Sequence, residues 1–234
     1  RHTISVSAFL LNRSSDLPTI YDSCWNTGVQ LFGSTRHFAY AVALTKGALA
    51  NPAARSNDGA QLVGRVGVQP SMGLQLGLSG AWGPYLDASA GDDPAFPSGK
   101  SVEDFKQLLF GLDAAYGIGR FEFTAEVMRN HFDVPNLAAG DDGLTNMGGY
   151  LESVVGLQPG LHWAARVGVI TFGDIDDGSG VKLAWDYDIT RLETGLEYYL
   201  TRDMHLKGVV QLNWRPDAPD DADHMLGAQL ATSF

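Results

Sequence analysis

The sequence predicts an all-β fold, a transmembrane antiparallel up-and-down β-barrel of about 12 strands in a single domain over residues 1–234. Three observations lead to it. Apolar and polar residues alternate along twelve segments, the links between those segments alternate between short and long, and no run of about 18 apolar residues could form a membrane-spanning helix. A mean hydropathy of −0.07 fits such a barrel, because only alternate strand residues face lipid.

A repeat of two residues is the sequence signature of a strand. The predicted strands cover residues 2–11, 26–33, 36–44, 60–68, 72–82, 105–116, 119–129, 144–157, 161–171, 189–200, 204–214 and 225–234. The last strand ends on Phe234, and a terminal aromatic residue in an amphipathic strand is typical of bacterial outer-membrane barrels. The first residues already have a strand pattern, so the numbering begins either at a processed end or inside a longer precursor.

The links predict how the strands are arranged. Tight links are expected at Ser34-Thr35, Gln69-Pro70-Ser71, Gly117-Ile118, Gln158-Pro159-Gly160 and Thr201-Arg202-Asp203, and long links at 12–25, 45–59, 83–103, 130–143, 172–188 and 215–224. Transmembrane barrels have short periplasmic turns and longer extracellular loops. Both termini are then expected at the periplasmic rim, and an even number of strands allows closure without unpaired edges. The alternative is a soluble all-β fold.

Apolar side chains form rows that are expected to face lipid. Examples are Met72, Leu74, Leu76, Leu78 and Trp82 on one strand, and Leu161, Trp163, Ala165, Val167 and Val169 on another. Trp82 and Trp214 lie near the long links, whereas Phe38, Tyr40, Tyr116, Phe121 and Phe234 lie near the tight links. Two aromatic levels around an aliphatic band are typical of membrane barrels. The alternative is that these aromatic residues fill a soluble core.

The opposite rows are polar, and an Arg or Lys at mid-depth in lipid would cost roughly 2–4 kcal/mol, so these rows are expected to face the lumen. The predicted pore-lining residues are Arg65, Gln75, Glu126, Glu152, Arg166, Arg191, Glu193, Glu197, Lys207 and Gln211; the same rows include Gln61, Gln107, Asp113, Glu122, His162, His205 and Asn213.

Hairpin register places opposite charges side by side. Leu157 pairing with Leu161 sets Glu152 opposite Arg166, and Leu200 pairing with Met204 sets Glu197 opposite Lys207. Such cross-strand pairs contribute roughly 0.2–1 kcal/mol each, so a structural role is expected, with solute selectivity as the alternative. A turn at Gly117-Ile118 would oppose Asp113 and Glu122, which repel each other.

Other classes of function have little support. The net charge of −11 argues against nucleic-acid binding, and Cys24 has no second cysteine with which to form an internal disulfide. The six histidines are scattered outside catalytic or metal-binding spacings, so neither an enzyme nor a cofactor is predicted. Asp174, Asp176 and Asp177 faintly resemble a calcium loop, but their spacing departs from it; divalent ions bridging to anionic lipid are an alternative to solvated turn residues.

Two segments carry a family resemblance. One is a hairpin formed by Asn26-Thr27-Gly28-Val29-Gln30-Leu31-Phe32-Gly33 and Phe38-Ala39-Tyr40-Ala41-Val42-Ala43-Leu44-Thr45-Lys46-Gly47, and the other is Arg65-Val66-Gly67-Val68-Gln69-Pro70. Together with the terminal Phe234, they resemble Gram-negative outer-membrane porins of the phosphate-selective O and P group. The resemblance implies a channel for small solutes, commonly trimeric, with around sixteen strands, of which this chain is a shorter relative or the C-terminal portion. No lysine ladder is present, so a phosphate preference is not carried over.

We therefore expect a passive diffusion channel in the bacterial outer membrane, in contact with lipid and lipopolysaccharide, with weak cation preference or none. The long 83–103 link is the best candidate for a constriction that folds into the lumen; a surface loop and a subunit contact are the alternatives. Two other functions are a barrel-borne lipid hydrolase and a non-conducting structural barrel, in which inward side chains such as Arg65, Arg166 and Lys207 plug the lumen.

Overall fold

The computed structural model describes residues 26–48, 56–135, 143–176, 181–216 and 224–232, and all structural statements concern these residues. Eleven strands form one antiparallel sheet in sequence order. They are β1 (Thr27–Ser34), β2 (Phe38–Lys46), β3 (Gln61–Ser71), β4 (Leu74–Pro84), β5 (Lys106–Ile118), β6 (Phe121–Phe132), β7 (Leu144–Gln158), β8 (Leu161–Phe172), β11 (Ile189–Thr201), β12 (Met204–Trp214) and β13 (Met225–Thr232).

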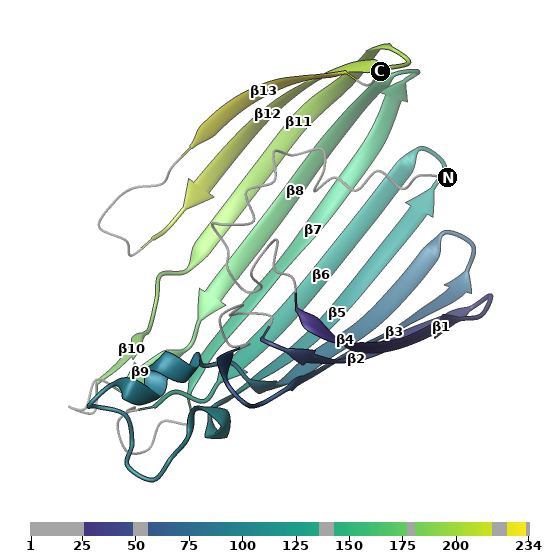
Figure 1. Cartoon of the computed structure of the whole chain (residues 1–234). Helices are drawn as coiled ribbons and strands as arrows, with labels where there is room; N and C mark the ends of the chain where they lie inside the picture. The colour runs from purple at the N-terminus through teal and green to yellow at the C-terminus, as the bar shows by residue number, and fades with distance from the viewer. Residues whose placement is uncertain (1–25, 49–55, 136–142, 177–180, 217–223, 233–234) are drawn as a thin grey trace.

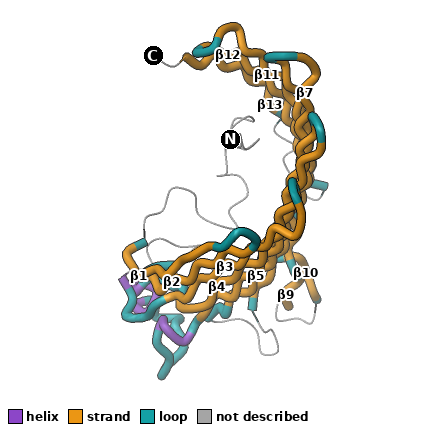
Figure 2. Tube along the Cα trace, turned by 90° about the vertical axis from the view of Figure 1, so that its right-hand side faces the viewer, coloured by secondary structure: helices purple, strands orange, loops and turns teal. Residues whose placement is uncertain are grey.

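The sheet is a strongly curved wall with long strands running side by side (Figure 1), and its cross-section is a wide arc (Figure 2). Every strand pairs with its neighbours in the chain, except that β8 pairs with β11 across the link that carries a small hairpin. β1 and β13 form the two edges of the described sheet. The predicted all-β, up-and-down antiparallel fold class is confirmed.

The predicted strands from 26–33 to 225–234 all appear in this sheet, whereas the predicted strand 2–11 and Phe234 lie outside the described residues. The long links also contain short elements. These are the 3₁₀ helices η4 (Ala88–Asp92) and η5 (Val102–Asp104) and the paired strands β9 (Asp174–Asp176) and β10 (Lys182–Ala184). None of the described helices is long and apolar enough to cross a membrane.

The tight links lie at one rim of the wall and the long links at the other, as predicted (Figure 1). Three tight turns are shifted from the predicted positions, and the β1–β2 turn is at Thr35-Arg36-His37. The β3–β4 turn is at Met72-Gly73 and the β5–β6 turn at Gly119-Arg120, so Met72 belongs to a turn rather than to an outward row. Gly73 and Gly119 adopt φ values of 83° and 60°, which these tight turns require and which glycine adopts without strain.

Register is confirmed in the strand interiors but not beside the turns. Glu152 lies opposite Arg166, and Glu197 lies opposite Lys207. Next to the turns, however, Leu161 pairs with Gln158 and Met204 pairs with Thr201, so the predicted partners of Leu161 and Met204, which were Leu157 and Leu200, are wrong. An irregularity in each hairpin takes up one residue and restores the interior register.

Exposure is inverted relative to a water-soluble β-sandwich. The apolar side chains of Leu76, Trp82, Val167 and Leu206 are 40–50% exposed, whereas Glu152, Glu193 and Gln211 on the other face are only 5–6% exposed. Side chains converge on the concave face of a curved sheet and spread apart on the convex face. The polar face is therefore the concave one, and the apolar band faces outward.

Candidate functional site

The ten predicted pore-lining residues all lie on the polar concave face, and pairing places most of them in two rows across the wall. One row joins Gln75, Ala115, Thr124, Glu152, Arg166, Glu193 and Gln211 on successive strands from β4 to β12. The neighbouring row joins Gly77, Asp113, Glu126, Tyr150, Gly168, Arg191 and Asn213. Arg65 lies next to the second row, on its long-link side. Glu197 and Lys207 lie on the tight-turn side of the first row.

In the first row, Arg166 lies between two carboxylates. It is directly opposite Glu152 on β7 and Glu193 on β11, and its Nε lies 4.0 Å from Glu193 Oε2. Its guanidinium carbon also stacks 3.8 Å from the ring centroid of Tyr150, which is a cation–π contact. These contacts hold the Arg166 side chain along the wall.

Closer to the tight-turn rim, the Glu197 carboxylate is surrounded by basic groups. Its Oε1 lies 3.3 Å from Lys207 Nζ and 3.7 Å from His205 Nε2, and the residue is only 2% exposed. His162 lies directly opposite Glu197 on β8, and Tyr199 contacts both imidazole rings at centroid distances of 5.9 and 5.3 Å. The carboxylate is therefore paired where burial makes an isolated charge costly.

In the β3–β5 part of the wall, an ion pair crosses an intervening strand. Arg65 on β3 makes a two-pronged contact with Asp113 on β5, and one of its N–O distances is 2.7 Å. The β4 residue directly opposite Asp113 is Gly77, and a Cβ there would collide with both charged side chains. The missing side chain of Gly77 therefore makes room for the bridge. Asp113 faces Glu126, rather than the predicted Glu122, because the turn lies at Gly119-Arg120.

A chain of four buried amides runs near the long-link rim. Gln61 Nε2 donates to Gln107 Oε1 (3.3 Å), Gln107 Nε2 to Asn130 Oδ1 (3.0 Å), and Asn130 Nδ2 to Asn146 Oδ1 (3.2 Å). The first bond again passes over a β4 glycine, Gly83, which lies opposite Gln107. Sequence reasoning missed the two asparagines, which lie directly opposite each other on β6 and β7, because the long link between these strands does not fix their register.

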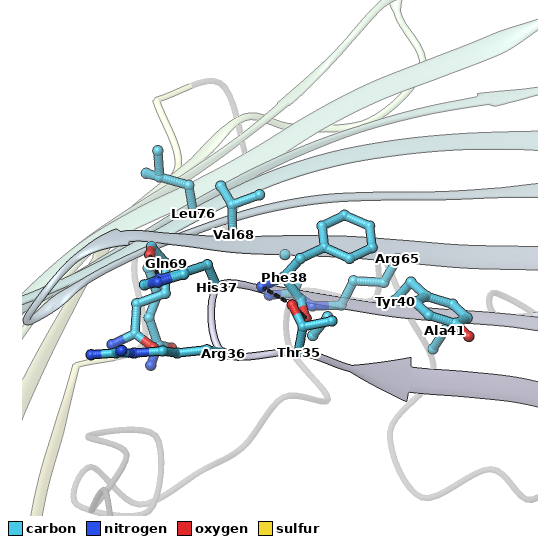
Figure 3. A pocket seen from close by; sticks show the side chains of 13 residues that line it. Thr35, Arg36, His37, Phe38, Tyr40, Ala41, Arg65, Val68, Gln69 and Leu76 are labelled. Carbon is cyan, nitrogen blue, oxygen red and sulfur yellow. Dashed lines mark hydrogen bonds between the residues drawn. The ribbon is translucent and has the colours of Figure 1, made fainter.

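A cavity of about 310 Å³ lies where β2, β3 and β4 approach the tight-turn rim. Figure 3 shows Arg36, His37 and Gln69 on one side of it and Arg65 and Tyr40 on the other. His37 Nδ1 lies 3.1 Å from the carbonyl oxygen of Gln69, whose own N–H donates to the His37 carbonyl oxygen (2.8 Å). The predicted pore-lining residue Gln75 also lines this cavity, so basic side chains and a residue of the polar face share it.

The long link after β4 is fastened to the segment before β3. Ser56 Oγ donates to Asp87 Oδ2 (2.5 Å), Asn57 Nδ2 to the Leu86 carbonyl oxygen (2.9 Å), and the Asp58 N–H to Glu103 Oε1 (3.0 Å). Hydrogen bonds from Ser56 and Ser89 lower the pKa of Asp87 to about 2. These contacts fix the link at the rim, and its inward folding as a constriction stays a prediction.

Two of the three acidic residues suggested for calcium lie at the same rim. Asp174 and Asp176 are the first and last residues of β9, while Asp177 lies outside the described residues. Within the described part of the chain, no group of three His, Cys, Asp or Glu side chains is arranged to hold a metal ion.

No protein-family model matches this chain, and no curated protein matches it. Among solved structures, it is similar to a porin with a TM-score of 0.58 at 16% identity, over 87% of this chain and 60% of the porin. A FadL homologue of Pseudomonas aeruginosa matches with a TM-score of 0.47 at 13% identity, over 89% of this chain and 66% of the homologue. The chain thus spans about three fifths of the porin's length, and its described strands have the fold of an outer-membrane β-barrel wall.

Proposed function

We propose that this chain is an outer-membrane porin through which small hydrophilic solutes or ions diffuse passively. One observation carries the proposal. The concave face is a network of buried, mutually paired polar side chains, whereas the outward face is an apolar band with aromatic residues near both ends of the strands. Such an inverted wall suits a polar lumen inside lipid, where polar groups replace part of the hydration of a passing solute.

The long cationic side chains support an open lumen over a plugged one. Arg65 is held by Asp113, Arg166 by Tyr150 and Glu193, and Lys207 by Glu197. Each contact is made within the same wall, with the adjacent strand for Arg166 and Lys207 and two strands away for Arg65, so these side chains lie along the wall. A non-conducting barrel would instead need them to extend across the interior. No described contact favours the hydrolase alternative.

The charges on the concave face support weak cation preference or none. Carboxylates outnumber cationic side chains there only modestly: the acids are Asp113, Glu122, Glu126, Glu152, Glu193 and Glu197, and the bases are Arg65, Arg166, Arg191 and Lys207. Because several of these opposite charges contact one another, the field that a solute meets is reduced.

Planar-bilayer recording tests this function. We expect discrete single-channel conductance and a reversal potential in a salt gradient that is near zero or slightly cation-selective. Arg166→Gln should shift the reversal potential toward cations, because Glu152 and Glu193 then face the lumen without their shared cation. Arg202→Gln, in the β11–β12 turn, is the matched control and should leave it unchanged. Absence of conductance, or strong anion selectivity, would refute the proposal.

The cellular setting follows from the same proposal. We place the chain in the outer membrane of a Gram-negative bacterium, with the tight-turn rim and both termini in the periplasm and the long links outside. The family resemblance further suggests a homotrimer. Native mass spectrometry of the protein extracted in mild detergent would count the subunits, and protease added to intact cells should cleave in the long links but not in the tight turns.

A further inference from the structure

The outward positions of the eleven-stranded sheet carry very few Lys, Arg, His, Asp or Glu side chains, and none of them is a carboxylate. The next carboxylate along the chain is that of Asp133, directly after β6, which accepts a hydrogen bond from the Lys106 N–H. At the outward positions of the described strands the ionisable residues are Lys46, Lys106, Arg129 and His131. All four lie toward the long-link ends of their strands. This is the opposite of the whole-chain balance, in which acidic residues outnumber basic ones 27 to 16.

Three of the four lie together on the β5–β6 hairpin. Phe110 on β5 lies opposite Arg129, Leu108 lies opposite His131, and Lys106 is the next outward residue on β5. His131 already has a partner, because its Nε2 lies 3.4 Å from Asp133 Oδ1. Lys106 Nζ lies 4.6 Å from the ring centroid of Trp82, and no ion pair to Arg129 is found among the described residues.

The depth of these residues follows from the length of the strand. Leu108 lies ten residues along β5 from Ile118, which is beside the tight turn. At roughly 3.3 Å per residue and about 45° of tilt, this separation corresponds to about 23 Å along the membrane normal. That is close to the apolar band of about 25 Å in outer-membrane barrels. Leu108 therefore marks the upper border of the band, with Lys106 just above it and Arg129 just below it, where a long side chain reaches up to the headgroups.

The surroundings of these cations are apolar and open. Leu108 and Phe110 on β5 and Met147 on β7, which lies opposite Arg129, are 49–53% exposed on the same face. An occupant therefore has to present negative charge at the border and hydrocarbon below it. A lipid with a phosphorylated headgroup has both parts in this order.

We propose that Lys106 and Arg129 form a binding site for the phosphates of lipid A, the membrane anchor of lipopolysaccharide. The site rests on the proposed outer-membrane orientation, in which the long-link rim meets the outer leaflet. The acyl chains lie over Leu108, Phe110 and Met147, and the contact with Trp82 holds the Lys106 ammonium group at the border of the band. The site is on the lipid side of the wall and takes no part in conduction.

Native mass spectrometry of the purified protein titrated with lipid A tests the site. Each cation near an anionic surface is worth about fivefold in affinity, so Lys106→Gln and Arg129→Gln should each weaken binding about fivefold and the double variant more than about tenfold. The wild-type protein should lose a similar factor toward lipid A from which the phosphates have been removed. This arm needs no variant and so does not depend on how the variants fold.

The same hairpin offers the control. Arg120 lies in the β5–β6 turn at the opposite rim, so Arg120→Gln should leave lipid A affinity unchanged. Equal affinity of the wild type for phosphorylated and dephosphorylated lipid A would overturn the site, as would an Arg120→Gln loss equal to that of Arg129→Gln. A change of oligomeric state in Arg129→Gln without loss of lipid affinity would overturn it in favour of a contact between copies of this chain.

Conductance separates this site from the proposed function. The double variant should conduct as the wild type does, because both side chains face away from the lumen. A wild-type protein that binds lipid A with the expected phosphate dependence but does not conduct would refute the porin proposal and keep the site. A conducting protein without phosphate dependence would do the reverse.

Discussion

The concave wall has two regions that pair their polar groups in different ways. From β8 to β12, charged side chains meet partners on the adjacent strand, as Glu193 meets Arg166 and Glu197 meets Lys207. From β3 to β5, they meet across an intervening strand, as Arg65 meets Asp113. The first arrangement needs only the correct register, whereas the second also needs glycine on β4 between the partners.

The difference shows that one chemical requirement has two structural solutions. Polar groups that are buried away from water must be paired. A curved sheet can pair them between directly opposite residues of adjacent strands, or between residues two strands apart where a glycine lies between them. The adjacent-strand pairs contain the more deeply buried charges, since Glu197 is 2% exposed while the Arg65 side chain is 52% exposed. The two regions should therefore respond differently to substitution.

The largest effect is expected from removing the partner of the most buried carboxylate. Lys207→Met leaves Glu197 with His205 as its nearest basic group, and breaking a buried ion pair should lower the free energy of unfolding by about 3 kcal/mol at neutral pH. Urea unfolding in lipid vesicles, followed by tryptophan fluorescence, measures this change. Adding Glu197→Gln should restore most of the loss, and a double variant as unstable as the single one would contradict the pairing argument.

The next largest effect is expected at Gly83 in the β3–β5 region, where the backbone at the start of β3 lies very close to β4. Gly83 has a φ of 153°, and a Cβ there would lie 2.7 Å from Gln61 Cα and 2.8 Å from the Ala60 carbonyl oxygen. Because backbone atoms cannot move aside easily, Gly83→Ala should cost about 2 kcal/mol of unfolding free energy. Gly208→Ala on β12 is the matched control, since nothing lies within 4 Å of its added Cβ, and it should change stability by less than about 0.5 kcal/mol.

A smaller change in stability is expected where the ion pair is half exposed. Arg65→Met removes the partner of Asp113, but solvent screens the carboxylate that remains, so the unfolding free energy should fall by about 1 kcal/mol or less. The reversal potential should nevertheless move toward cation preference, because Asp113 then faces the lumen uncompensated. A stability loss as large as that of Lys207→Met would remove the distinction between the two regions.

The smallest effect concerns the link that fastens the rim beside the β3–β5 region. The pKa of Asp87 is lowered from 3.8 to about 2, so its ionised form stabilises the link above pH 4, and this stabilisation is lost as the pH falls toward 2. Hydrogen exchange of the Ser89 amide, which donates to Asp87 Oδ1, should lose protection over that range. In Asp87→Asn the protection should no longer vary with pH there, and an unchanged pH profile in this variant would exclude Asp87 as the cause.

Much of the wall could be predicted because its pattern is local. The alternation of apolar and polar residues assigns Leu76 and Glu152 to opposite faces. Matching opposite charges sets Glu152 opposite Arg166, although the predicted pairing beside the β7–β8 turn is wrong. The β5–β6 turn was misplaced because Gly117 and Gly119 are both plausible turn residues. Only pairing along the whole of both strands fixes Gly119 as the residue with positive φ.

The sequence by itself determined the strands of the described sheet, the polar and apolar faces of their interiors, and the Glu152–Arg166 and Glu197–Lys207 pairs. Each follows from a repeat of two residues and from matching adjacent segments. Only the tertiary structure decided that Arg65 reaches Asp113 over Gly77 and that Gln61 reaches Gln107 over Gly83. The physical reason is that curvature brings side chains two strands apart within contact distance, but only where the strand between them carries no side chain.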